Sequence, residues 1–492
     1  MAAIITEKFR LHNAKQFKKS ASSDGTNEMY MFIGRPLSWA DDNSPPTPVD
    51  SLNDEFDAYA NMTALKEVQN TDVSHAIIRR DWTSGTTYDE YRHNYSSSNT
   101  ANSGATTLWA STYYVVTSDY NVYKCISNNG NSASTDMPTG TGTSIITTTD
   151  SYKWKYMYSI SASEVIKFVT SDFIPVKTIG AKSAVDGDGT NGGLNSTATN
   201  DLSAQWDVEN TSVDGSIEHA RVTQQGSGYG SNGTSIVNIS GDGGTGGAST
   251  IAKLTVTVAS TNITSVAVTQ AGSGYSVASI DNALLQAATG SSGTGAQFDI
   301  IISPKNGHGS DAVEELGGNY VIVNSRLEYA EGAGDFPTDN DFRQIGLIAK
   351  PTNKGGNVLS TAATLSALNK FTMNNSDTMP NVDDYIASAG TVVAGTKVGR
   401  VVSVDSTNKH VYYLPAVDSV GNYNDFANGN DIFAGATLGS LAEKGDVKSS
   451  GGIDTAYPEI QRNSGDIVYL ENRGAVARAA DQIEDIKLII EM

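Results

Sequence analysis

Two segments between residues 111 and 161 alternate aromatic or β-branched residues with polar ones. They read STYYVVTSDYNVYKCIS from Ser111 to Ser127 and SYKWKYMYSIS from Ser151 to Ser161. A period of two is typical of half-buried strands, so both segments predict β-strands. The expected aromatic face of the second segment consists of Tyr152, Trp154, Tyr156 and Tyr158. Such a face favours a sheet core or a subunit contact over an exposed stacking platform.

Residues 51–68 have a helical spacing instead. The apolar residues that recur every three or four positions are Leu52, Phe56, Tyr59, Met62 and Leu65. This spacing predicts a helix with one apolar face. We expect Ser51 to cap the helix N-terminus and Asp54 to provide the acidic partner of a capping box.

A glycine-rich phrase occurs twice, as VTQQGSGYG from Val222 to Gly230 and as VTQAGSGYS from Val268 to Ser276. Each copy leads to a second glycine-rich turn and then to an alternating strand, so the phrase marks a duplicated β unit. The expected strand faces are Leu254, Val256 and Val258 in the first copy and Phe298, Ile300 and Ile302 in the second. The glycines expected to supply positive φ angles in structural turns are Gly226, Gly228, Gly272 and Gly274.

Three ligand-binding interpretations of these glycines compete with the structural one. A phosphate cradle needs GxxxxGK[ST] or a strand-turn-helix GxGxxG, and neither context is present. A calcium-binding nonapeptide array needs a strict period that the chain lacks. A sugar-binding turn, with a ring stacked on Tyr229 or Tyr275, stays open as the weaker alternative to structural turns.

The predicted domain organisation is a core interrupted twice. The core comprises residues 1–205, 310–360 and 451–492, with the duplicated unit inserted at 206–309 and a small β module inserted at 361–450. That second module reads as strand, turn, strand. Its expected core residues are Val398, Val401, Val404, Val411 and Tyr413.

Composition excludes several classes of protein. The chain has 492 residues, 48 glycines and a formal net charge of −21, which argues against nucleic acid as a general partner. Its single cysteine, Cys125, cannot form an intrachain disulfide and is expected to be a buried thiol. No apolar run is long enough for a signal peptide or a membrane span. The locally basic N-terminus is interpreted as a solvated segment rather than a binding arm.

No catalytic constellation is evident. The six histidines are scattered outside metal-binding spacings, and no GxSxG elbow occurs. The adjacent carboxylates Asp383-Asp384 and Glu314-Glu315 do not suit a glycosidase, because neighbouring residues on a strand point to opposite faces. They are interpreted as solvated acids. We therefore predict a protein that is not an enzyme and needs no cofactor or metal.

Two short segments combine the residue types that dominate protein contacts. IIRRDW, from Ile77 to Trp82, brings Arg79, Arg80, Asp81 and Trp82 together. YLENR contributes Tyr469, Glu471, Asn472 and Arg473. Arg and Trp are enriched where water is excluded, so both segments are candidates for an interface or for a lock within the core, as are Trp154 and Tyr156.

Five segments in order resemble the baseplate wedge subunit eight of T-even-like contractile-tailed phages. They are FIGRPLSWADDNSPPTPVDS, IIRRDW, SYKWKYMYSIS with FIPV after it, DFRQIGLIAKP and SGDIVYLENRGAVARAADQIEDIKLII. The resemblance covers roughly residues 1–200, 310–355 and 455–492. The two inserted modules depart from the family pattern and are expected to emerge at loops.

The resemblance implies a multi-layer β-sandwich with helix-bearing loops and no catalytic activity. It also implies a homodimer that binds the other baseplate wedge subunits, is assembled in the host cytoplasm and is located in the virion tail baseplate. A rigid subunit of this kind would transmit rigid-body rearrangement during tail contraction. The alternatives are a tail adhesin or fibre-type protein that binds host glycans, favoured by the repeated GSGY phrase, and a depolymerising enzyme.

Overall fold

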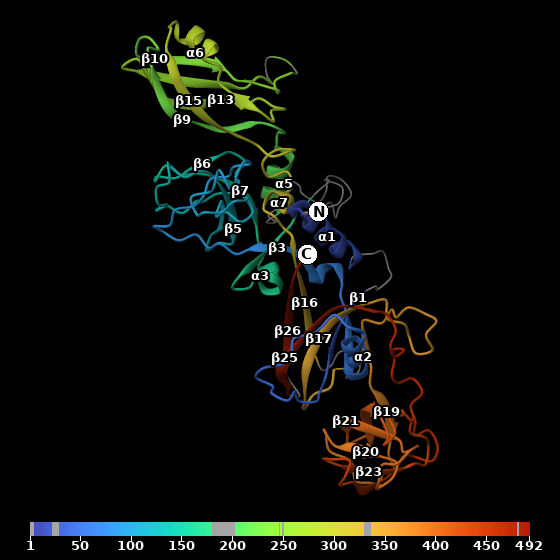
Figure 1. The fold of residues 1–492 in the computed structure, drawn as a ribbon. Coiled ribbons are helices and arrows are strands. Elements are labelled where there is room, and N and C mark those ends of the chain that lie inside the picture. The colour runs from blue at the N-terminus through green and yellow to red at the C-terminus, as the bar shows by residue number, and fades with distance from the viewer. Residues whose placement is uncertain are drawn as a thin grey trace. The chain divides into compact units, whose positions relative to one another are not determined.

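The computed structural model describes residues 4–21, 29–179, 202–245, 247, 250–328, 336–479 and 482–492 (Figure 1). Over these ranges the chain is mainly β, with 40% strand, 12% helix and seven antiparallel sheets. The mainly β fold class is therefore confirmed, whereas the stacking of sheets into sandwich layers stays a prediction.

The chain divides into two compact units. The first unit comprises Met1–Ala14, Ser74–Ile322 and Ile490–Met492, and the second comprises Lys15–Val73 and Val323–Ile489. The division falls within β3 (Val73–Ile78), β16 (Tyr320–Glu328) and β26 (Ile483–Glu491), which belong to the four-stranded sheet β26-β16-β3-β8.

The first unit contains an aromatic sheet with the order β4-β5-β7-β6. Its strands are β4 (Tyr114–Val116), β5 (Asn121–Ser127), β6 (Ile146–Thr147) and β7 (Lys153–Ser159), so both predicted strand segments are confirmed. Its side chains enter two separate apolar clusters. Cys125 is fully buried in one of them, as expected, and burial raises the pKa of its thiol.

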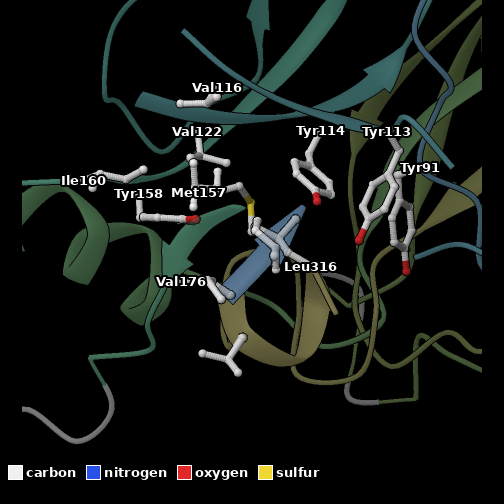
Figure 2. Packing of buried hydrophobic residues seen from close by; sticks show 14 of the residues in the cluster. Tyr91, Tyr113, Tyr114, Val116, Val122, Met157, Tyr158, Ile160, Val176 and Leu316 are labelled. Atoms are coloured by element: carbon white, nitrogen blue, oxygen red, sulfur yellow. The ribbon is translucent and has the colours of Figure 1, made fainter. Parts of the chain in front are cut away.

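The predicted four-ring face is wrong at Tyr158. Along β5, Val122 pairs with Tyr158 and Tyr123 pairs with Tyr156, so Met157 is an extra residue in β7. A bulge of this kind interrupts the alternation of side chains. Tyr158 consequently packs with Met157 and Val122 in one cluster, which Figure 2 shows, while Tyr156 packs in the other.

Three of the buried phenols of the cluster in Figure 2 donate a hydrogen bond to a backbone carbonyl. Tyr113 donates to the Glu315 carbonyl at 2.6 Å, Tyr114 to the Ile78 carbonyl at 2.7 Å, and Tyr158 to the Pro175 carbonyl at 2.8 Å. These bonds offset the cost of burying the hydroxyls and tie the cluster to β3 and to β8 (Phe173–Val176), which pair antiparallel.

Short helices flank these sheets. They are α3 (Ala162–Phe168), α5 (Leu202–Asn210) and α7 (Ala312–Glu315). Ser161 and Glu164 form a reciprocal capping box at the start of α3. The N-terminal segment, which the sequence did not predict to be helical, forms α1 (Glu7–Ser20), with Leu11 and Ala14 buried.

The duplicated phrase forms a module whose two copies exchange strands. The first copy contains β9 (Ile217–Ser227), β10 (Gly233–Asn238), β11 (Ser240–Gly241) and β12 (Lys253–Ala259). The second contains β13 (Asn262–Gln270), β14 (Ala278–Ser279), α6 (Asn282–Thr289) and β15 (Thr294–Ile302). β9 pairs with β15, β12 with β13 and β11 with β14, so each pairing joins one copy to the other.

The glycines of the phrase adopt the conformations predicted for them. Gly226, Gly228, Gly272 and Gly274 have φ angles of 62°, 81°, 65° and 75°. This left-handed region is costly for residues with a Cβ, so these positions favour glycine. The expected strand face of Leu254, Val256 and Val258 is also buried.

The two GSGY tyrosines are structural in the same reciprocal way. Tyr229 of the first copy accepts the Ala296 N–H of the second at 3.1 Å, and Tyr275 of the second accepts the Ala252 N–H of the first at 3.0 Å. Both rings are buried. The sugar-stacking interpretation of Tyr229 and Tyr275 is therefore wrong, because neither ring face is open to a ligand.

The second unit contains a five-stranded sheet with the order β18-β2-β1-β17-β25. Its strands are β1 (Met29–Gly34), β2 (Met62–Glu67), β17 (Asn340–Ala349), β18 (Thr364–Ser366) and β25 (Asp466–Arg478), and η1 (Asn70–Asp72) follows β2. Three of the segments that carry the family resemblance thus become neighbouring strands, β1, β17 and β25.

The predicted helix of residues 51–68 is shorter than its apolar spacing suggested. It is α2 (Leu52–Asn61), capped by Ser51, whose hydroxyl accepts the Asp54 N–H at 3.2 Å. Met62 and Leu65 belong to β2 and are buried in the sheet core. The predicted apolar helical face was wrong at these two residues because they lie on a strand, where pairing with β1 overrides the helical period.

The remaining strands form a six-stranded sheet, β19-β22-β21-β20-β23-β24. They are β19 (Asn369–Thr372), β20 (Tyr385–Ala387), β21 (Val398–Asp405), β22 (His410–Ala416), β23 (Asp431–Gly435) and β24 (Ala442–Asp446). The predicted strand-turn-strand is β21 and β22. Val401, Val411 and Tyr413 lie in its core, and Val404 packs against it.

Candidate assembly interface

The IIRRDW side chains diverge rather than forming one buried network. The Arg79 Nε lies 3.0 Å from both carboxylate oxygens of Asp81, and its Nη1 donates to the Thr170 carbonyl at 3.0 Å. More than half of the Asp81 side chain is exposed, so this ion pair contributes about 0–1 kcal/mol. The pair orients the segment more than it stabilises it.

Arg80 and Trp82 contact the first unit itself. The Arg80 guanidinium lies 4.4 Å from the Tyr114 ring centroid and donates to the Trp109 carbonyl at 3.2 Å. Trp82 packs against the cluster that contains Trp154 and donates from Nε1 to the Ser134 hydroxyl at 3.1 Å. These contacts join the IIRRDW segment to other residues of the same unit.

Trp154 and Tyr156 are fully buried within the first unit. The Trp154 ring stacks on Tyr152 with centroids 5.4 Å apart, and the Tyr156 hydroxyl lies 2.7 Å from the Ser159 hydroxyl. A partner cannot reach either ring without unfolding the sheet. Both residues therefore lie in the core of this unit.

The YLENR segment lies on β25, where its polar groups are engaged within the second unit. Tyr469 donates to Glu471 at 2.9 Å, and burial together with that carboxylate raises the pKa of Tyr469 to about 12. Asn472 donates to the Pro46 carbonyl and accepts from Gln344. The Arg473 side chain is exposed, and its Nε lies 3.4 Å from Glu471 Oε1.

The loop before α2 lies along this strand. Trp39 donates from Nε1 to the Arg473 carbonyl at 2.8 Å. Arg343 of β17 is buried, forms a two-pronged ion pair with Asp42 at 2.9–3.0 Å, and donates to the Pro36 carbonyl at 2.7 Å. The guanidinium lowers the pKa of Asp42. The sequence analysis missed Arg343, although it lies in the DFRQIGLIAKP segment.

An exposed apolar surface borders the same strand, and we call it the α2 surface. It consists of Val49, Leu52, Phe56 and Val468, which are 64%, 72%, 55% and 50% exposed. Val49 and Val468 line a hollow of about 280 Å³ together with Pro48, Asp50, Ser51, Asp54, Glu55, Ile467, Tyr469 and Leu470, whereas Leu52 and Phe56 do not line it. Clustered large apolar side chains at the surface often mark a protein contact.

A second exposed apolar group occurs at the start of α1, in the first unit. Ile4, Ile5 and Phe9 are all more than half exposed. Ile4 and Ile5 line a cavity of about 610 Å³ together with Trp109 and Tyr114. The IIRRDW segment reaches this cavity through Ile78.

A buried charged cluster was missed altogether. Lys124 of β5 and Glu315 of α7 form an ion pair, and His308 Nδ1 lies 2.7 Å from Glu315 Oε1 and contacts Lys124 Nζ. Burial, with Lys155 nearby, lowers the pKa of Lys124, and burial with Lys124 nearby lowers the pKa of His308. The interpretation of Glu315 as a solvated acid is wrong, since its side chain is nearly fully enclosed.

Asp384 is the second acid that the sequence analysis wrongly placed in solvent. It is buried, and it accepts hydrogen bonds from the Asn381 backbone N–H at 2.9 Å and from the Asn381 side-chain amide at 3.2 Å. Its neighbour Asp383 is exposed and pairs with Arg400 at 3.1 Å. Adjacent acids on this loop therefore have different environments.

The N-terminal part of the chain has a known relative. Residues 3–130 match the family model described as Phage-Gp8: Bacteriophage T4, Gp8. Over this stretch, about a quarter of the chain, the protein is similar to the Gp8 family. Gp8 is a baseplate wedge protein, so the resemblance seen in the sequence is confirmed over these residues. No curated protein matches the chain.

The Gp8 match implies a structural role in the phage baseplate and a location in the virion baseplate. The Gp8 family is non-enzymatic, a statement that covers residues 3–130. The matched stretch contains both IIRRDW and the first three residues of the α2 surface, whereas YLENR lies outside it.

The described ranges contain no group of three or more His, Cys, Asp or Glu side chains placed to hold a metal ion. In the same ranges, no helix is both long and apolar enough to cross a membrane.

Proposed function

We propose that this protein is a structural subunit of the tail baseplate wedge that connects neighbouring wedge subunits. The observation that carries the proposal is the Gp8 match over residues 3–130, within which Val49, Leu52 and Phe56 are exposed. Apolar side chains held on a capped helix form a rigid surface suited to docking. We also propose that two copies form a homodimer, with the subunits assembling in the host cytoplasm.

The charge around the α2 surface favours another wedge subunit as its partner over a second copy of this chain. Asp50, Asp54 and Glu55 line the adjoining hollow. Two copies meeting here across a twofold axis would bring these carboxylates face to face, which is unfavourable. A partner that carries apolar residues rimmed by lysine or arginine would complement the surface, so the dimer contact would lie elsewhere.

The sedimentation of the purified chain, alone and mixed with the other purified wedge subunits, tests this proposal. We expect a dimer that enters a larger complex when the other subunits are added. A chain that stays separate from every wedge subunit would contradict the proposed function, and an elongated trimer would favour a fibre-type protein.

Introducing a negative charge on the α2 surface should weaken this association. We expect Leu52→Asp and Phe56→Asp each to raise the Kd for the wedge partner at least about tenfold, because each places an acid in the apolar contact. Since both side chains are exposed, the melting temperature should stay unchanged. Val358→Asp, at a residue 63% exposed outside this surface, is the matched control. Equal affinities of all three variants would rule out a contact at α2.

We infer that Trp82 locks the first unit rather than contacting a partner, since its ring and its N–H are both engaged internally. Trp82→Ala should lower the free energy of unfolding by about 1–3 kcal/mol while the folded protein still joins the wedge. Urea denaturation and the sedimentation assay measure the two effects separately. Normal stability combined with lost assembly would instead assign Trp82 to an interface.

In this proposal, the subunit transmits movement during tail contraction because its sheets are stiff. A subunit whose sheets are held by buried aromatic clusters and by a buried ion pair would move as a rigid body with its neighbours. The alternative of an adhesin acting through the GSGY phrase loses its basis, because Tyr229 and Tyr275 are buried.

A further inference from the structure

A cavity of about 350 Å³ lies in the second unit beside the six-stranded sheet. Residues from four parts of the chain line it: Lys354; Asn369 and Lys370 of β19; residues between Tyr413 and Phe426; and residues between Ile453 and Arg462. Its volume is within the range of small-molecule sites, roughly 300–1,000 Å³. Neither the Gp8 match nor the proposed wedge role accounts for it.

The cavity contains an arginine, Arg462, that contacts an aromatic ring but no hydrogen-bond acceptor among the described residues. Over the described part of the chain, the Arg462 guanidinium has neither a hydrogen-bond acceptor nor a carboxylate within ion-pair distance. It lies 5.6 Å from the Tyr423 ring centroid. A half-buried guanidinium has five donors in a planar fork, which suit a carboxylate ligand.

Two further groups at the same cavity are also available. The Tyr423 ring is 56% exposed, and its hydroxyl has no hydrogen bond to any residue that the structure describes. Asp425 is exposed and, within the same described ranges, is likewise unpaired. An open aromatic face beside an acid acceptor and a guanidinium donor provides stacking and hydrogen bonding for a ring that carries hydroxyls.

The other charges of the cavity are satisfied internally. Lys370 forms an ion pair with Asp454 at 3.1 Å and lies 4.7 Å from the Tyr457 ring centroid. Lys354 donates to the Tyr457 carbonyl at 2.5 Å. With three cations against two carboxylates, the cavity is locally positive although the chain carries a net charge of −21. The imbalance favours an anionic ligand.

We propose that this cavity binds an acidic saccharide, a sugar ring bearing a carboxylate. The carboxylate would pair with Arg462, the ring would stack on Tyr423, and a hydroxyl would donate to Asp425. A glycan site here is separate from the GSGY module. It also adds to the wedge role without depending on it, because the α2 surface does not share any residue with the cavity.

Calorimetric titration of the full chain with glucuronic acid, glucose and acetate tests the proposal. We expect saturable binding of glucuronic acid and at least about tenfold weaker binding of glucose, which lacks the carboxylate. Acetate should bind at least about tenfold more weakly too, because it lacks the ring. No saturable binding of glucuronic acid, or equal binding of all three ligands, would overturn the proposal.

Two variants assign the contacts. Arg462→Gln should remove the preference for glucuronic acid over glucose, and Tyr423→Ala should weaken both sugars. Arg473→Gln, at an exposed arginine outside the cavity, and Val420→Ala, at an exposed residue near Tyr423, should bind like the parent chain. If Arg462→Gln instead blocks wedge assembly and leaves sugar binding unchanged, the cavity is a protein contact and the saccharide proposal is wrong.

Discussion

Lys124→Met is expected to lower the free energy of unfolding by about 3–5 kcal/mol, because it leaves the Glu315 carboxylate buried without its cation. Lys124 is fully buried, so water cannot take over the role of the ammonium group. Urea denaturation, followed by amide hydrogen exchange in β5 and α7, measures the loss. The exchange readout assigns the effect to the first unit.

A double variant distinguishes the missing charge partner from simple loss of packing. Lys124→Met with Glu315→Gln should recover part of the lost stability, since the amide can still accept the Gly309 N–H and no carboxylate remains buried. Arg326→Gln breaks the exposed pair with Glu328 and should change stability by no more than about 1 kcal/mol. A similarly small effect of Lys124→Met would show that the ion pair does not hold this unit together.

Tyr229→Ala should lower the free energy of unfolding by about 3–5 kcal/mol and loosen both copies of the duplicated module. The cost is that of a large buried side chain. The ring contacts the second copy: a Cβ placed on Gly293 would lie 2.5 Å from it, and the hydroxyl accepts the Ala296 N–H. Hydrogen exchange should therefore increase in β15 as well as in β9.

Graded variants check the origin of this effect. Tyr229→Phe keeps the ring and loses only the hydroxyl, which also donates to Asn282 Oδ1 at 2.8 Å, so its cost should be about 1–2 kcal/mol. Val277→Ala, at a residue 64% exposed in the same module, should be close to neutral. If hydrogen exchange became faster in β9 alone, the two copies would be stable independently. Strand pairing between the copies would then not be what stabilises them.

The duplicated module separates features that depend on the local sequence from features that depend on distant segments. The four turn glycines were predicted correctly because positive φ is a property of single residues. The pairing of β9 with β15 was not, since these two strands lie tens of residues apart in the sequence, whereas β12 and β13 are neighbours joined by Ser260 and Thr261. The registers of these strands in the folded module show which partner each strand takes.

At the candidate interface, too, the sequence predicted some features and not others. IIRRDW and YLENR were recognised by composition, yet composition does not say whether a side chain points inward, and most of their polar groups bond within their own unit. Leu52 and Phe56 of the α2 surface were predicted to share one apolar helical face, but apolar spacing is the same whether such a stripe is buried or left for a partner. Burial distinguishes the two cases.

The sequence by itself determined the mainly β class, the strands at β5, β7, β21 and β22, the Ser51 cap and the turn glycines, because each depends on side chains within a few residues. Only the tertiary structure decided the end of α2 at Asn61, the side-chain shift at Met157 and the exchanged strands. It also brought together Lys124, His308 and Glu315, and likewise Tyr423 and Arg462. These features arise from contacts between distant segments, and the free energy of burying them together overrides local preference.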